Sequence, residues 1–83
     1  MNLDPIVARG RVVAAARALA GLDQEGLAAA AGLSPSSVSK IELGRRGVRP
    51  DTFAKVLGAL DRLGIDLARN DRTGHHAVGT SFD

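Results

Sequence analysis

The chain has 83 residues, a net charge of +2 and no cysteine. At about 100–200 residues per domain, this length predicts one small domain. The missing cysteines exclude disulfides, thiolate metal sites and thiol nucleophiles. Aromatic residues are nearly absent, whereas 14 alanines and 10 glycines favour closely packed helices. No apolar run is long enough to span a membrane and no leader opens the chain, so we expect a soluble, cytoplasmic protein.

Positive charge is concentrated in the first part of the chain. Residues 1–50 hold seven basic and four acidic side chains, whereas residues 51–83 hold four and five. Between Lys40 and Arg49, four basic side chains stand against one acid. This clustering favours an anionic partner, nucleic acid first, although a solvated basic surface gives the same pattern.

The first half of the chain predicts three helices with local start and stop signals. Asp4-Pro5 caps a helix over about 5–20, in which Gly10 is a weak point that costs about 1 kcal/mol relative to alanine. Asp23 precedes a short helix that extends to about residue 31 and is ended by Gly32. Ser34-Pro35 begins a third helix, which runs to about residue 43.

A fourth helix and a tail of different periodicity follow. Pro50-Asp51 predicts a helix over about 51–63, with an apolar stripe made of Phe53, Val56, Leu57, Leu60 and Leu63. Residues 65–67 alternate between apolar and polar, as residues 77–82 do less clearly, and residues 70–76 have the composition of a turn. The tail is therefore either a small β-hairpin or a frayed end.

The second and third helices and residues 31–34 between them predict a helix-turn-helix unit, in which the second helix enters the major groove of DNA. With Val38 and Ile41 turned inward, a rotation of about 100° per residue places Ser36, Ser37 and Lys40 outward. Hydroxyl and ammonium groups can bind base edges and phosphates. An ordinary solvated helix face is the alternative.

Residues distributed over positions 10–60 carry a family resemblance. They are Arg17, Gly21-Leu22, Gln24-Glu25, Leu27-Ala28, Ala31-Gly32-Leu33-Ser34, Val38-Ser39, Ile41-Glu42, Gly44-Arg45, Pro50 and Leu60. In this order and spacing, the stretch resembles the phage-repressor-type, or XRE-like, Cro/repressor helix-turn-helix family. The resemblance implies an all-α, lambda-repressor-like bundle of four or five helices that forms a homodimer and binds a double-stranded DNA operator.

The resemblance also implies roles for particular positions. The base-facing positions are Pro35, Ser36, Ser37 and Lys40. The phosphate-facing candidates are Gln24, Ser34, Ser39, Arg45, Arg46 and Arg49, for which helix-end polarity and a basic surface loop are the alternatives. Arg17 and Glu42 match a structural ion pair between the first helix and the end of the third. Pro35 departs from the family because it offers only apolar contact, and Gly26 leaves the capping box of the second helix incomplete.

We expect a DNA-binding domain over residues 1–64, with its helix-turn-helix unit at about 23–43, and a C-terminal extension over 65–83. The dimer contact is assigned to Leu63, Ile65, Leu67 and Phe82, unless the tail folds over its own core. The predicted function is a transcriptional regulator, a repressor or controller that binds a pseudo-palindromic operator. The alternative is an antitoxin-type DNA-binding protein whose C-terminal tail binds a partner toxin. No catalytic motif, cofactor site or metal site is evident, and His75-His76 is interpreted as a surface loop.

Overall fold

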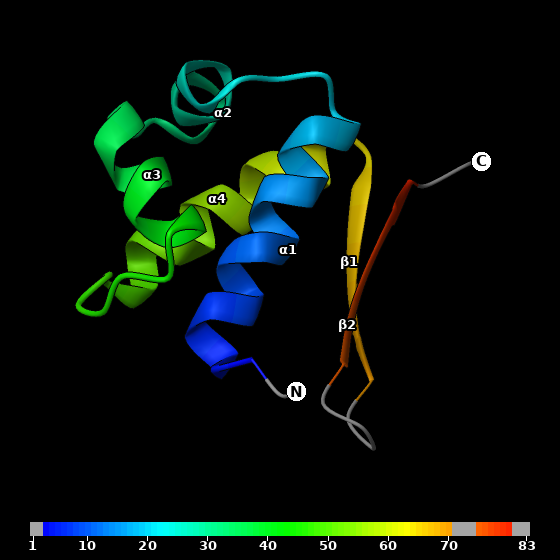
Figure 1. Cartoon of the computed structure of the whole chain (residues 1–83). Coiled ribbons are helices and arrows are strands. Elements are labelled where there is room, and N and C mark those ends of the chain that lie inside the picture. Colours follow the sequence, from blue (N-terminus) through cyan, green and yellow to red (C-terminus); the bar gives the residue numbers. More distant parts are fainter. Residues whose placement is uncertain (1–2, 71–74, 81–83) are drawn as a thin grey trace.

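The structure is a computed structural model that describes residues 3–70 and 75–80. In this part of the chain, four helices are followed by two antiparallel strands (Figure 1). The elements are α1 (Pro5–Leu19), α2 (Gln24–Ala31), α3 (Pro35–Glu42), α4 (Pro50–Arg62), β1 (Ile65–Asn70) and β2 (His75–Thr80). The all-α bundle predicted from the sequence is confirmed. Among the described residues, no helix is long and apolar enough to cross a membrane.

The predicted starts of α1, α2 and α3 are confirmed, because each depends on a local capping side chain. The Asp4 carboxylate accepts a hydrogen bond from the Ile6 amide at 2.8 Å, and the Asp23 carboxylate accepts one from the Gly26 amide at 2.7 Å. These bonds satisfy amides that lack a partner within the helix. The start of α4 differs from the prediction, since its N-cap residue is Arg49, which makes no side-chain cap bond.

The core lies where the four helices meet. Its buried members are Val13, Ala16, Leu27, Ala28, Ala31, Val38, Ile41, Val56, Ala59, Leu60 and Ile65. Three predicted members of the α4 stripe lie further out, and one of them, Leu57, is half-buried. Leu63 is 45% exposed because it follows the last turn of α4, and Phe53 is half-buried beneath the guanidinium of Arg9.

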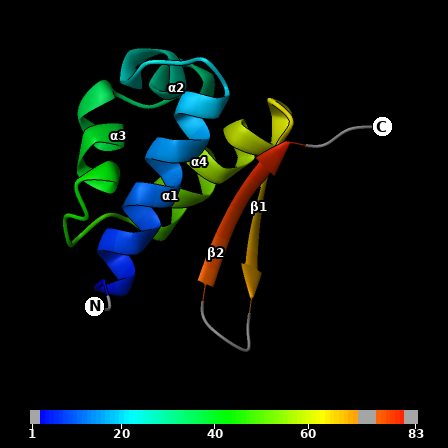
Figure 2. The same cartoon turned by 45° about the vertical axis from the view of Figure 1, so that its right-hand side comes forward.

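The C-terminal segment forms the β-hairpin that was one of the two alternatives. β1 and β2 pair antiparallel, with Ile65 opposite Thr80 and Leu67 opposite Val78. The hairpin packs against α1 and α4, on the opposite side of α1 from α3 (Figures 1 and 2). Ile65 is 4% exposed, so β1 completes the core and the frayed end is ruled out for these strands. The division into residues 1–64 and 65–83 stays a prediction.

Two glycines let α1 lie directly against the end of α3. A Cβ on Gly10 would collide with the carbonyl oxygen of Ile41 and lie 2.8 Å from that of Glu42. A Cβ on Gly44, whose φ is +71°, would lie 2.9 Å from Cα of Val7. The interpretation of Gly10 as a weak point is therefore wrong, because the missing side chain is what permits this backbone approach.

Candidate nucleic-acid interface

The exposed side of α3 is the main candidate for a surface that contacts nucleic acid. Val38 and Ile41 are at most 1% exposed and fix the inner face of this two-turn helix. Pro35, Ser36 and Lys40 are exposed on its outer side. In Figures 1 and 2, α3 lies at the edge of the bundle, remote from the hairpin. The helix can therefore approach another macromolecule without rearrangement of the core.

Serine hydroxyls surround the N-terminus of α3. The Ser34 hydroxyl lies 3.1 Å from that of Ser37 and 3.4 Å from that of Ser36, and it accepts a hydrogen bond from the Ser37 amide at 3.4 Å. Ser34 and Ser36 are exposed, whereas Ser37 and Ser39 are half-buried. Because a hydroxyl both donates and accepts, this cluster can exchange its internal bonds for bonds to an anion or a base edge.

An ion pair ties α3 to α1. The Arg17 guanidinium donates from Nε to Oε2 of Glu42 at 2.7 Å and from Nη2 to Oε1 at 3.0 Å. Its Nη1 donates to the carbonyl of Leu22 at 3.0 Å. The side chains of Arg17 and Glu42 are 21% and 7% exposed. The hydrogen bond to Glu42 raises the pKa of Arg17, although burial acts in the opposite direction. The structure thus brings these two predicted partners together as a bidentate pair.

Gln24 joins the same network, which sequence reasoning did not foresee. Its amide Nε2 donates to Oε1 of Glu42 at 3.0 Å, linking the first residue of α2 to the last residue of α3. One amide N–H is used in this bond, which leaves the second N–H as a donor. The contact spans 18 positions in the chain, so no local pattern could have indicated it.

The loop between α3 and α4 presents three exposed arginines, two of which have acidic partners within the chain. Arg46 Nη2 lies 3.3 Å from Oδ2 of Asp4, and Arg49 Nε lies 3.2 Å from Oδ1 of Asp51. Neither pair was expected from the sequence. Arg45 makes no ion pair with any residue that the structure describes. The basic loop is therefore partly neutralised by its own chain.

The residues expected at a dimer contact lie in different environments. Leu63 is exposed, whereas Ile65 is buried and Leu67 packs against the core of its own chain. The burial of Ile65 corresponds to the alternative in which the tail folds over its own core. Phe82 lies outside the described residues.

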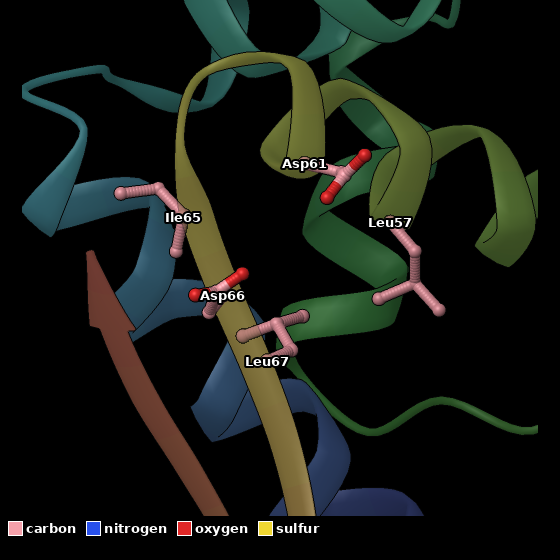
Figure 3. A pocket seen from close by; sticks show the side chains of 5 residues that line it. All are labelled: Leu57, Asp61, Ile65, Asp66 and Leu67. Atoms are coloured by element: carbon pink, nitrogen blue, oxygen red, sulfur yellow. The ribbon is translucent and has the colours of Figure 1, made fainter. Parts of the chain in front are cut away.

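A shallow cavity of about 230 Å³ lies between α4 and β1. Figure 3 shows Leu57 and Asp61 of α4 across from Asp66 and Leu67 of β1. Small-molecule sites usually enclose about 300–1,000 Å³, so this cavity is small for that purpose. Among the residues that the structure describes, no three His, Asp or Glu side chains are grouped as a metal site would require. His75 and His76 belong to β2 and not to a loop.

Comparison with known proteins agrees with this geometry. The sequence profile of the helix-turn-helix family matches residues 13–67. Two crystal structures of the clp gene regulator ClgR from Corynebacterium glutamicum are similar, each with 31% identity, a TM-score of 0.64 and 74% of this chain covered. The match covers 78% of the chain in one of these structures and 65% in the other. A comparison with curated proteins gave no match.

The family match includes α2, α3 and the turn between them, together with Arg17 and Glu42. It therefore covers the exposed face of α3 and the ion pair that holds this helix. The chain belongs to the XRE-type helix-turn-helix family of DNA-binding transcriptional regulators.

Proposed function

We propose that the chain is a repressor that binds a pseudo-palindromic operator as a homodimer, with α3 of each copy in the major groove. The observation that carries this proposal is the outer face of α3, whose polar side chains are exposed while Glu42 anchors the end of the helix to α1. A recognition helix must be held rigidly, since a small change in its angle moves every base contact.

In this arrangement, Lys40 and Ser36 read base edges together with Ser37. A lysine ammonium can donate to O6 and N7 of guanine, and a serine hydroxyl can pair with several bases. Pro35, at the first position of the helix, contributes an apolar contact such as that with a thymine methyl group. Lys40 and Ser36 are both exposed and four positions apart, so they lie on one side of α3.

Phosphate contacts surround this face. The second amide N–H of Gln24 binds a phosphate oxygen while the first remains on Glu42. Ser34 and Ser39 contribute hydroxyls, and Arg45, Arg46 and Arg49 contribute cations from the loop after α3. Such contacts supply most of the affinity and its dependence on salt, but they carry no direct sequence information.

The homodimer places two α3 helices in successive major grooves, about 34 Å apart. We assign its contact to the side of the bundle that carries Leu63, where an exposed leucine adjoins the start of the hairpin. We also assign Phe82, which lies outside the described residues, to this dimer contact. Ile65 and Leu67 are used in the core, so β1 is not a free segment for a toxin, and we favour the operator-binding function over the antitoxin alternative.

The base-reading and phosphate-binding roles can be separated with two substitutions that each remove one positive charge. Lys40→Ala should weaken binding to the operator, identified by selection from random DNA, more than binding to random DNA. The two losses of binding free energy should differ by about 1–3 kcal/mol. Arg45→Ala should lower affinity for both DNAs by similar factors. Equal losses on the two DNAs for Lys40→Ala would contradict its base-reading role.

A further inference from the structure

The N-cap residue of α1 has a second role at the edge of the candidate interface. Oδ1 of Asp4 accepts the hydrogen bond from the Ile6 amide, and Oδ2 faces Nη2 of Arg46 at 3.3 Å. One carboxylate thus caps a helix with one oxygen and pairs with a loop arginine with the other. The two contacts use different atoms, so they can be separated by mutation.

The fold itself brings these residues together. Asp4 and Arg46 are 42 positions apart in the chain, but the start of α1 lies against the chain that leaves α3. Gly44 permits this, since a Cβ at that position would lie 2.9 Å from Cα of Val7. The contact between Asp4 and Arg46 is therefore a consequence of how α1 packs on α3.

We propose that Asp4 competes with DNA phosphate for Arg46 and thereby lowers the affinity of the protein for DNA. The proposal rests on the proposed function, because it assumes that this loop meets the phosphate backbone. A phosphate that approaches Arg46 must either displace the carboxylate or remain close to its negative charge. Both outcomes weaken binding relative to a loop in which Arg46 has no acidic partner.

The strength of the contact sets the size of the effect. The side chains of Arg46 and Asp4 are 78% and 43% exposed, and a single N–H is within bonding distance of the carboxylate. Exposed ion pairs of this kind are weak, so the competition costs at most about five-fold in affinity for each bound protomer. Asp4 therefore reduces the contribution of Arg46 without abolishing it.

The neighbouring arginines provide an internal comparison. Arg49 has an equivalent acidic partner in Asp51, at 3.2 Å. Arg45 is exposed and has no ion pair among the residues that the structure describes. Arg45 is thus the loop arginine that can bind phosphate without first losing a carboxylate.

Asp4→Asn tests the proposal without removing the helix cap. Asparagine keeps Oδ1, which accepts from the Ile6 amide and caps helices about as well as aspartate. Its amide nitrogen replaces Oδ2 and cannot accept from Arg46. The matched control is Asp61→Asn, which makes the same change in charge at an exposed residue near the opposite end of α4 from the loop. Both variants are compared with the wild type in the full chain.

The measurement is fluorescence anisotropy with a labelled random-sequence duplex, over a series of salt concentrations. We expect Asp4→Asn to bind about two- to five-fold more tightly than the wild type. Its plot of log K against log salt should be steeper by up to about 0.9. Asp61→Asn should change neither the affinity nor the salt slope to this extent. When the protein already carries Arg46→Gln, adding Asp4→Asn should give no gain in affinity.

Several results would overturn the proposal. Unchanged or weaker binding by Asp4→Asn would show that the carboxylate does not compete with phosphate. Equal gains for Asp4→Asn and Asp61→Asn would assign the effect to net charge alone, and a gain that persists with Arg46→Gln would exclude Arg46 as the mediator. Failure of the wild type to bind any duplex would refute the proposed function instead. The anisotropy titration of the wild type alone distinguishes this outcome from the others.

Discussion

Removal of the Glu42 carboxylate should destabilise the protein more than its position at a helix end suggests. The Glu42→Ala substitution removes two charge-assisted hydrogen bonds with Arg17, at 2.7 and 3.0 Å, and the bond from Gln24 at 3.0 Å. It also leaves the Arg17 guanidinium, which is only 21% exposed, without its counter-charge. The loss therefore combines broken bonds with a stranded charge.

The magnitude follows from the burial of the pair. Truncating one partner of a buried ion pair costs about 3–5 kcal/mol. Arg17 retains its bond to the Leu22 carbonyl and some access to water, so we expect a smaller loss, of about 2–3 kcal/mol. The total free energy of unfolding of a domain of this length is about 4–12 kcal/mol. Its melting temperature falls by about 4–8 °C for each kcal/mol of that free energy that is lost.

Urea unfolding followed by far-UV circular dichroism measures this loss, and a double-mutant cycle identifies its cause. Arg17→Met combined with Glu42→Met should cost less than the sum of the two single substitutions, because no charge is then left without a partner. A cost for Glu42→Ala below about 0.5 kcal/mol would refute the reasoning, since that is the value of an exposed surface pair.

Three further predictions concern the same framework. Gly10→Ala should destabilise the protein in urea, although alanine is favoured in helices by about 1 kcal/mol, because its Cβ meets the end of α3; a stabilised variant would contradict this packing. Asp23→Ala should cost about 1 kcal/mol through loss of the cap on α2, and Asp23→Asn should restore most of it in the same assay. Because the pKa of Arg17 is raised, the contribution of Arg17 to the free energy of unfolding is fully present below the ordinary arginine pKa. It is lost only as the pH rises through the raised pKa. The stability difference between wild type and Arg17→Met should therefore be constant from neutral to mildly alkaline pH in urea titrations, and a decline there would argue against this assignment.

Helix positions were predictable from the sequence because their signals are local. Asp4, Asp23 and Ser34 each bond an amide two or three residues further along, and Gly32 ends α2 with φ of +70°. The inward faces of the helices were also predictable, because the positions of apolar residues directly reflect the helical period.

Contacts between distant segments could not be predicted in this way. Gly10 was interpreted from helix propensity alone, whereas its role depends on the carbonyls of Ile41 and Glu42. The hairpin remained an open alternative because short strands are stabilised by what they pack against. The pairing of Arg46 with Asp4 follows from the approach of α1 to the end of α3, which no periodicity encodes.

Selection of bound duplexes from a random DNA pool, with measurement of the mass of the resulting complex, tests the central claim most directly. The account predicts enrichment of a pseudo-palindrome whose half-sites are about one DNA turn apart, bound by two copies of the chain. Absence of any enriched sequence, or an enriched site bound by a single copy, would contradict it.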